Sequence, residues 1–322
     1  MIEFQGVSRS FGAVRAVDGV DLKIEAGEFV VLIGASGSGK STLLKMINRM
    51  ESHDQGRILF DGAEINSFKP RELRLRMGYV IQSVGLFPHW SVARNIAVVP
   101  QMLGWERPRI EARINTLLEL FALDPTLYRE RFPHQLSGGQ QQRVGVARAL
   151  AGDPAVLLMD EPFGALDPLI RASLQQEIAR VHQSSGKTIV MVTHDIDEAL
   201  RLATRIVLLD RGRIVQVATP LQLLAEPANA QVEDFVGRSD VGIRLLSLRP
   251  AASLARSEPP CAGPGLPATA TLREVVSHLA ARQSACVNLT DAAGGHAGVL
   301  HAADVFSPKA QPGTAPAVAN HG

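Results

Sequence analysis

One glycine-rich segment, residues 34–41 with the sequence Gly-Ala-Ser-Gly-Ser-Gly-Lys-Ser, limits the possible folds of this chain most strongly. It follows the apolar run Phe29–Ile33 and precedes an amphipathic stretch over residues 40–50, so a buried strand, a turn and a helix come in succession. Glycines let the N–H groups of such a turn converge on an anion, and the helix start adds partial positive charge. The sequence therefore predicts a phosphate-binding loop, in which Lys40 reaches the β- and γ-phosphates of a nucleotide and Ser41 ligates Mg²⁺. The residues expected to contact the phosphates are Gly34, Ala35, Ser36, Gly37, Ser38, Gly39, Lys40, Ser41 and Thr42.

Further apolar runs continue this pattern over the first 235 or so residues. Buried strands are expected over residues 156–159, 188–192 and 206–209. The helical patterns between them indicate crossover connections and a mostly parallel sheet, which places the chain in the α/β class. Residues 2–7 and 20–24 alternate in a way that favours an antiparallel sheet, and residues 83–152 predict a helical subdomain inserted between core strands.

Composition excludes several classes of protein. The 322 residues carry a formal net charge of +1, which gives no electrostatic case for binding nucleic acid. The two cysteines, Cys261 and Cys286, are too few for a disulfide framework or a zinc site and agree with a reducing compartment. The first residues lack the apolar core of a secretory signal, and no apolar run reaches the roughly 18–20 residues that span a bilayer. A role at a membrane would therefore require docking onto partners that span it.

Two more motifs carry chemistry that fits a phosphate-binding loop. The run 156–159 ends in Asp160 and Glu161, and ligands of open α/β sheets bind at the carboxyl ends of strands. We expect Asp160 to hold Mg²⁺ and Glu161 to orient attacking water, although an acidic pair alone could cap a helix. Residues 136–140, Leu-Ser-Gly-Gly-Gln, open a helical run and predict a second phosphate-binding helix start. Since the loop already supplies one, we expect two chains to sandwich the nucleotide, each offering Ser137, Gly138, Gly139 and Gln140 to the other.

In this order the motifs resemble the nucleotide-binding subunit of ABC transporters, and the resemblance covers about residues 2–236. It implies an ABC-type P-loop NTPase fold, with a RecA-like core, an antiparallel β-subdomain and an inserted helical subdomain. It also implies ATP and Mg²⁺ as cofactors and a homodimer, or a pair of ATPase subunits, that closes around two ATP molecules. Because Glu161 is present, ATP hydrolysis is expected.

The resemblance assigns roles to further residues. Gln82 resembles the glutamine that contacts Mg²⁺ or attacking water and senses the membrane partner, and His194 resembles the histidine that touches the γ-phosphate. Residues 165–167 resemble the segment that crosses the dimer interface, which places Asp167 at the nucleotide. Phe11 stands where the family stacks an aromatic ring on adenine, although such a residue could also be core. The expected catalytic residues are Lys40, Gln82, Glu161 and His194, and the expected metal ligands are Ser41, Gln82 and Asp160.

The sequence of residues 82–92, together with residues 46–49 and 99–101, is similar to that of the ATPase subunits of importers for quaternary-amine osmoprotectants (glycine betaine, choline, carnitine, proline betaine). In ABC proteins this segment lines the groove that receives the membrane subunit, so permease contacts are expected near residues 82–95. Phe87 and Trp90 could equally be ordinary core aromatics. The resemblance further implies an indirect substrate-binding partner and a peripheral location at the cytoplasmic face of the plasma (bacterial inner) membrane.

Other classes remain as alternatives. An importer of another small solute, such as an amino acid, would share every motif described above. ATPases of DNA repair and chromosome structure share the nucleotide-binding head, but they usually carry long coiled coils or zinc sites, which are not evident here. A translation-associated ABC protein would need two ATPase domains, and a RecA-like motor would lack residues 136–140.

The composition changes after the ATPase region, which we assign to residues 1–237. Residues 238–268 are rich in Pro, Ala and Ser and are predicted to be a linker. Residues 269–306 show a helix, an apolar strand, an Asp/Gly turn, a second strand and a final helix, and they resemble a single CBS repeat, a small α/β unit. Regulation is one hypothesis for it, and a packing or dimerisation unit is the alternative. Residues 307–322 are predicted to be disordered.

Overall fold

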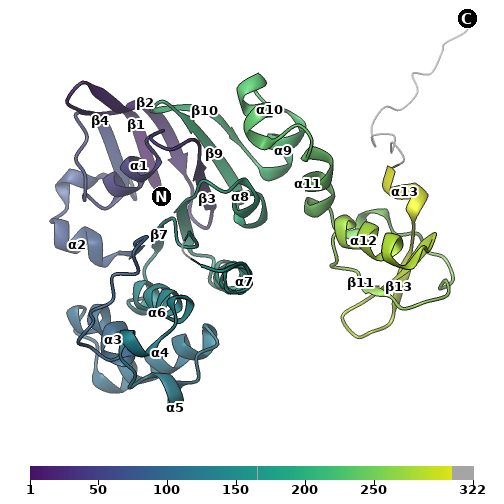
Figure 1. Ribbon diagram of the computed structural model, residues 1–322. Coiled ribbons are helices and arrows are strands. Elements are labelled where there is room, and N and C mark those ends of the chain that lie inside the picture. The colour runs from purple at the N-terminus through teal and green to yellow at the C-terminus, as the bar shows by residue number, and fades with distance from the viewer. Residues whose placement is uncertain (165, 307–322) are drawn as a thin grey trace, which may run out of the picture. The chain divides into compact units, whose positions relative to one another are not determined.

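The computed structural model describes residues 1–164 and 166–306, and the chain divides into one unit over Met1–Arg238 and a second that begins at Ser239 (Figure 1). The predicted disorder of residues 307–322 lies outside the described residues. The two units are described separately below.

A six-stranded sheet with the order β10-β9-β3-β8-β7-β6 forms the centre of the first unit. Its strands are β3 (Phe29–Ile33), β6 (Met77–Val80), β7 (Val156–Asp160), β8 (Thr188–Val192), β9 (Arg205–Asp210) and β10 (Arg213–Ala218). The neighbours from β9 to β6 pair in parallel, and only β10 runs antiparallel to its neighbour. Every residue of β3, β7 and β8 is buried, as expected for short apolar strands covered on both faces.

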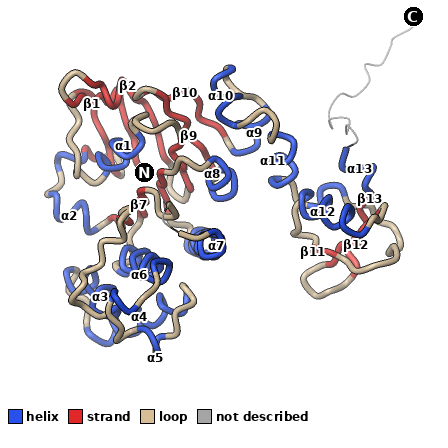
Figure 2. Tube along the Cα trace, in the orientation of Figure 1, coloured by secondary structure: helices blue, strands red, loops and turns tan. Residues whose placement is uncertain are grey.

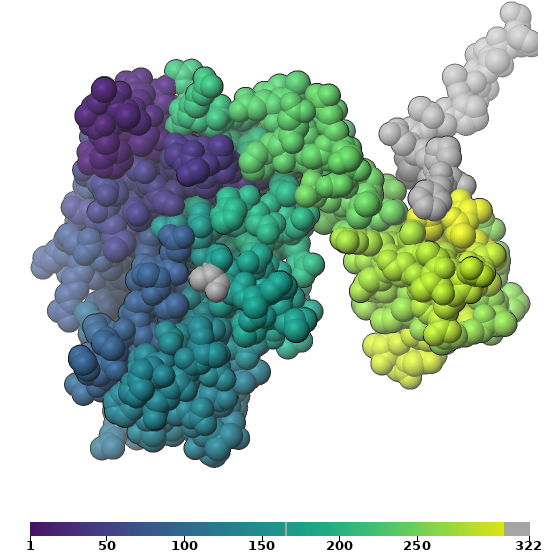
Figure 3. Space-filling model, in the orientation of Figure 1, coloured from purple at the N-terminus to yellow at the C-terminus, as the bar shows by residue number. Residues whose placement is uncertain are grey.

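An antiparallel sheet with the order β2-β1-β4-β5 lies against this centre, as predicted from the alternation near the N-terminus. Its strands are β1 (Ile2–Phe11), β2 (Val14–Ile24), β4 (Gln55–Phe60) and β5 (Ala63–Glu64). One apolar core joins both sheets around α1 (Lys40–Ile47), with Phe4 and Phe60 from the small sheet and Leu158 and Val190 from the large one. The strands of both sheets are red in Figure 2. Strand β2 also contacts β10, so the purple N-terminal atoms and the green atoms near residue 215 adjoin in Figure 3.

The predicted helical subdomain lies between β6 and β7. It contains α3 (Val92–Met102), α4 (Arg107–Leu120), α5 (Pro125–Tyr128) and α6 (Gly138–Ala151), and α3 packs against both α4 and α6. The remaining helices of this unit are α2 (Pro70–Leu75), α7 (Pro168–Ser185), α8 (Ile196–Leu202), α9 (Pro220–Ala225) and α10 (Ala230–Val236). Among the described residues, no helix combines the length and the apolar character that crossing a bilayer requires.

The second unit contains α11 (Val241–Leu248), β11 (Leu266–Pro267), α12 (Leu272–Arg282), β12 (Cys286–Thr290), β13 (His296–His301) and α13 (Ala302–Phe306). Its helix–strand–strand–helix order over residues 272–306 follows the predicted pattern. Residues 238–268 differ from the predicted linker. They form α11, bury Ala251 in the core of this unit, and pair β11 in parallel with β12. These elements could not be predicted from the sequence, because the apolar residues that anchor the segment are scattered between prolines and serines and show no period.

Candidate active site

Four neighbouring parallel strands bring the predicted residues to one edge of the large sheet. The phosphate loop (residues 34–41) follows β3, and His194, Glu161 and Gln82 follow β8, β7 and β6. Because the carboxyl ends of parallel strands meet at the same edge, the sheet order alone places these residues side by side. The first unit therefore gathers a phosphate-binding segment, a carboxylate, a histidine and a glutamine in one place.

The phosphate loop requires glycine at two positions. Gly34 has φ 145°, and a Cβ there would lie 2.1 Å from the carbonyl oxygen of Leu209. Gly39 has φ 98°, and its Cβ would lie 2.2 Å from the carbonyl oxygen of Ala16. Both close approaches are to backbone atoms that cannot rotate away, so any side chain would force the loop or its neighbours to move.

Lys40 occupies the interior of this loop. Its Nζ donates to the carbonyl oxygens of Gly34 (2.9 Å) and Ala35 (2.7 Å) and to Ser38 Oγ (3.3 Å). Burial lowers the pKa of the Lys40 ammonium, and the charges of Glu161 and Asp160 oppose that shift. An ammonium with three donors fixed at the centre of a glycine-rich turn is well placed to bind phosphate oxygens.

Asp160 and Ser41, two of the three predicted metal ligands, contact each other. Ser41 Oγ donates to Asp160 Oδ1 at 2.8 Å, which joins the start of α1 to the end of β7. Burial raises the pKa of Tyr79, and the Asp160 carboxylate next to it raises that pKa further. No group of three or more His, Cys, Asp or Glu that could hold a metal occurs in the described part of the chain. A hydroxyl and a single carboxylate nevertheless suit Mg²⁺, which takes few protein ligands beside substrate phosphates.

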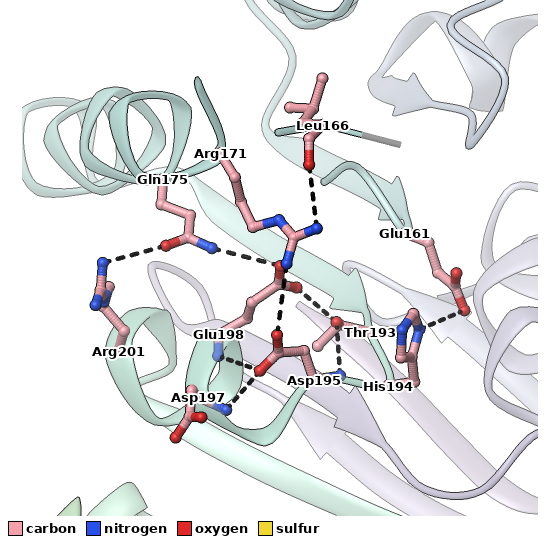
Figure 4. A network of polar contacts seen from close by, with 10 residues as sticks. All are labelled: Glu161, Leu166, Arg171, Gln175, Thr193, His194, Asp195, Asp197, Glu198 and Arg201. Carbon is pink, nitrogen blue, oxygen red and sulfur yellow. Dashed lines mark hydrogen bonds and ion pairs between the residues drawn. The ribbon is translucent and has the colours of Figure 1, made fainter. Parts of the chain in front are cut away.

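The Glu161 carboxylate is the meeting point of the other predicted residues. Gln82 Nε2 donates to its Oε2 (3.2 Å). His194 Nδ1 lies 3.4 Å from its Oε1, as Figure 4 shows. The backbone of Glu161 has φ 45°, an uncommon value for a residue other than glycine, and its N–H donates to the carbonyl oxygen of Val192 (3.0 Å). The fold therefore holds this side chain in one place at a cost in backbone strain.

The start of α6 lies apart from this group within one chain. Ser137 caps the helix and forms a capping box with Gln140, whose Nε2 donates to the hydroxyl of Tyr128 (3.0 Å). A Cβ on Gly139 would lie 2.4 Å from the Ile170 side chain, so glycine allows α6 to pack closely on α7. Over the described residues, no hydrogen bond joins this helix start to the phosphate loop. Within one chain, the two predicted phosphate-binding segments therefore share no hydrogen bond among the described residues.

Asp167 and Phe11 lie at the surface of the first unit. Asp167 caps α7, and its Oδ1 accepts from the N–H groups of Leu169 and Ile170 (both 3.1 Å). Phe11 ends β1 with 45% of its surface exposed, and the Arg9 guanidinium lies 4.8 Å from the centre of its ring. This exposure excludes the alternative that Phe11 is a core residue. The exposed part of the ring is accessible to a base, and the Arg9 guanidinium forms a cation–π contact with the ring.

Two functional candidates were missed by the sequence analysis. Asn95 on α3 is fully buried, and its side chain binds the backbone of Phe87, Trp90 and Ser91. Arg148 on α6 donates to the carbonyl oxygens of Gly85 (2.7 Å) and Val84 (3.0 Å), and its burial lowers its pKa. A polar residue on the apolar face of α3 was the available signal for Asn95. Both residues fix the segment that follows Gln82.

This segment borders an open groove of about 380 Å³. Its lining includes Gly78, Gly85, Phe87, Val98, Met102 and Arg148. Phe87 packs against Trp90 with ring centres 4.3 Å apart, and 44% of Phe87 is exposed. Phe87 is therefore a groove residue rather than an ordinary core aromatic, and Arg148 places a cation beside it.

Comparisons with known proteins agree with this geometry. The family model described as "ABC transporter" matches residues 17–164, which include the phosphate loop, the start of α6 and Glu161. The chain is 57% identical over 306 residues to the "Glycine betaine uptake system ATP-binding protein YehX" of Escherichia coli (strain K12), covering 95% of this chain and 99% of that protein. It is 50% identical over 251 residues to the "Glycine betaine/carnitine/choline transport ATP-binding protein OpuCA" of Bacillus subtilis (strain 168), covering 78% of this chain and 65% of OpuCA.

A solved structure gives the same result. The dimeric ATP-binding cassette in a post-hydrolysis state bound to ADP and Pi is similar with a TM-score of 0.61 and 32% identity, over 68% of this chain and 99% of that one. The chain belongs to the family of ATP-binding proteins of ABC transporters, and it is an ATPase that binds ATP.

Proposed function

We propose that this chain is the ATP-hydrolysing subunit of an importer for quaternary-amine osmoprotectants, such as glycine betaine, choline, carnitine or proline betaine. The observation that supports hydrolysis is the position of the Glu161 carboxylate. It contacts both Gln82 and His194 at the edge of the large sheet that also holds the phosphate loop. The substrate class is supported by the names and identities of YehX and OpuCA, since no residue of an ATPase subunit touches the transported solute.

ATP binding begins at the phosphate loop. Lys40 exchanges its three hydrogen bonds within the loop for bonds to the β- and γ-phosphates, and the start of α1 adds positive potential. Ser41, Asp160 and the Gln82 side-chain oxygen would hold Mg²⁺, which when bound neutralises charge on the phosphate oxygens. Phe11 stacks on the adenine ring.

Glu161 acts on the water that attacks the γ-phosphate. Its carboxylate accepts a proton of that water and aligns the oxygen with the bond that breaks, which is positioning combined with electrostatic stabilisation. His194 lies next to the other oxygen of the same carboxylate, and we expect it to contact the γ-phosphate. Gln82 links this group to the segment that borders the groove.

A second copy completes the site. The start of α6 carries N–H groups without helical partners and helix-dipole charge, and among the described residues of one chain it forms no hydrogen bond with the phosphate loop. In a homodimer, residues Ser137, Gly138, Gly139 and Gln140 of each subunit face the nucleotide of the other, and Asp167 lies at the contact. The dimeric form of the similar solved cassettes supports this arrangement.

The groove beside residues 82–95 receives an integral membrane permease subunit. Its apolar floor and the exposed Phe87 suit an inserted helix from that partner. The ATPase therefore sits peripherally at the cytoplasmic face of the plasma membrane, which is the bacterial inner membrane, and meets a substrate-binding protein only indirectly.

We propose a regulatory role for the second unit, in which residues 269–306 resemble a single CBS repeat. Removal of residues 239–322 at the boundary between the units should leave ATP hydrolysis intact and change the dependence of uptake on osmolarity. An unchanged osmotic response in the truncated protein would assign the unit to packing or dimerisation instead.

Two measurements test the main proposal. Glu161→Gln should bind ATP as the wild type does and hydrolyse it at a rate reduced by orders of magnitude, whereas near-normal turnover would exclude the assigned role. Uptake of labelled glycine betaine, choline and carnitine by cells that contain the full transporter tests the substrate class. Uptake of an amino acid in place of all three would favour the alternative importer.

A further inference from the structure

A buried hydrogen-bond network lies directly behind the Glu161–His194 pair. Thr193, which precedes His194, is 2% exposed, and Glu198 on α8 is 5% exposed. Thr193 Oγ1 donates to Glu198 Oε2 at 2.6 Å and accepts from the N–H of Asp195 at 3.1 Å. The turn that presents His194 is therefore fastened on both sides of that residue by one buried hydroxyl.

Arg171 on α7 connects this turn to the segment after Glu161. One of its terminal nitrogens donates to the carbonyl oxygen of Leu166 at 3.2 Å, and the other lies 3.9 Å from Asp195 Oδ2 (Figure 4). Asp195 in turn caps α8 by accepting from the N–H of Glu198. A single guanidinium thus spans the two segments that leave β7 and β8.

Glu198 has a shifted pKa, and a small cavity lies beside it. Burial raises the pKa of Glu198 and the Asp195 carboxylate raises it further, while the Thr193 hydroxyl, Arg171 and His194 act in the opposite direction. A small cavity of about 30 Å³ is lined by residues of both sides, including Glu161, Arg171, Thr193, His194 and Glu198. The Glu161 carboxylate therefore borders the same cavity as the residues of this network.

We propose that Thr193, Glu198 and Arg171 are positioning residues for ATP hydrolysis, and that they hold the His194 turn in register with the Leu166 segment. None of them contacts the phosphates in this proposal; they act through Asp195 and the backbone of the turn. The inference rests on the proposed roles of Glu161 and His194. It adds that Arg171 couples the position of Leu166, which adjoins the proposed contact with a second copy at Asp167, to the position of His194.

Substitution of Thr193 separates positioning from folding. Thr193→Val keeps the volume and removes the hydroxyl, whereas Thr193→Ser keeps the hydroxyl and loses one methyl group. We expect Thr193→Val to lower kcat on the order of tenfold to a hundredfold, as for a displaced catalytic group, with KM and the binding affinity for ATP within about twofold of wild type. Thr193→Ser should restore kcat. Equal kcat in all three proteins would overturn the proposal, and so would a parallel loss of ATP binding and kcat.

Substitution of Arg171 provides a second test that does not depend on a buried position. Arg171→Met removes both of these contacts. Arg201→Met is the matched control, because Arg201 donates to Gln175 at the rim of the same network and, among the described residues, forms no hydrogen bond or ion pair with Leu166 or Asp195. We expect Arg171→Met to lower kcat at unchanged ATP affinity and Arg201→Met to retain it. Equal effects of the two substitutions would overturn the link through Arg171.

The Glu161→Gln variant, measured in parallel, distinguishes failure of the proposed function from failure of the proposed positioning network. If Glu161→Gln turns over normally, the proposed function fails. If Glu161→Gln is inactive while Thr193→Val and Arg171→Met are fully active, only the positioning network fails.

Discussion

Replacement of Asn95 by leucine should loosen the segment that borders the groove. The Asn95 Oδ1 accepts from the N–H of Phe87 at 2.8 Å, and its Nδ2 lies within hydrogen-bond distance of three carbonyl oxygens, those of Phe87 (3.2 Å), Trp90 (3.1 Å) and Ser91 (3.1 Å). Leucine has a similar shape and can make none of these bonds. Asn95→Leu therefore removes the polar contacts of a buried side chain while it keeps the packing volume.

The size of the effect follows from counting these contacts. An amide group has two N–H donors, so at most three good hydrogen bonds are lost, each worth about 1 kcal/mol net. The backbone groups left unpaired add a cost, which is limited because the exposed side of this segment readmits water. The leucine side chain gains about 1 kcal/mol from apolar burial. The expected loss in the free energy of unfolding is about 2–3 kcal/mol.

Urea unfolding of the wild type, Asn95→Leu and Asn115→Leu measures this loss. Asn115 on α4 is the matched control, since it is only half-buried and accepts one bond, from Arg129 at 3.3 Å; its substitution should cost less than about 1 kcal/mol. ATP affinity should stay unchanged in both variants because the phosphate loop is not touched. A loss below about 0.5 kcal/mol for Asn95→Leu would refute the reasoning, because it falls within the range of surface substitutions.

Three further predictions concern the phosphate loop, the base and a buried acid. Gly39→Ala should abolish ATP binding in calorimetric titrations, since its Cβ meets the Ala16 carbonyl, whereas Gly37→Ala (φ 77°, no atom within 4 Å of a Cβ) should fold with a strain of about 1–2 kcal/mol and retain measurable binding. Phe11→Ala should raise KM for ATP by about fivefold or more without lowering kcat, in line with a lost base stack; equal KM values would exclude the stacking role. Burial raises the pKa of Glu177 above its usual 4.5, so the folded chain holds this proton more tightly than the unfolded chain, and its contribution to stability falls as the pH rises from about 4.5. In urea titrations at several pH values, the free energy of unfolding of Glu177→Gln should therefore fall less than that of the wild type as the pH rises from about 4.5. The same pH dependence in both proteins would contradict this assignment.

The core of the ATPase unit could be predicted because its signals are local. Strands β3 and β8 have the predicted limits, since each is a short, continuously apolar run with turn residues on both sides. The phosphate loop and the carboxylate pair were expected from local patterns, whereas Gln82 and His194 were assigned only through the resemblance to ABC transporter subunits; each of the four follows a parallel strand. The sheet order then brings together Gln82 and Glu161, which are 79 residues apart in the chain.

Long-range polar contacts could not be predicted in this way. Arg148 fixes the backbone at Gly85, 63 residues earlier, and Gln175 reaches Glu198 across two helices. Arginine, glutamine and glutamate on amphipathic helices are ordinarily solvated, so composition and period give no sign of burial. The prediction of a linker over residues 238–268 failed for the related reason that β11 and Ala251 owe their place to packing against α12 and β12 rather than to any local pattern.

The central claim is that two copies complete each ATP site, and the molar mass of Glu161→Gln in the presence of ATP tests it most directly. Light scattering should show a monomer without nucleotide and a dimer with one ATP per chain when hydrolysis is blocked. The double variant Glu161→Gln with Ser137→Arg should bind ATP equally well and remain monomeric, because the start of α6 can no longer approach the partner's nucleotide. A dimer of the double variant as stable as that of Glu161→Gln, or a monomer of Glu161→Gln at saturating ATP, would contradict the account.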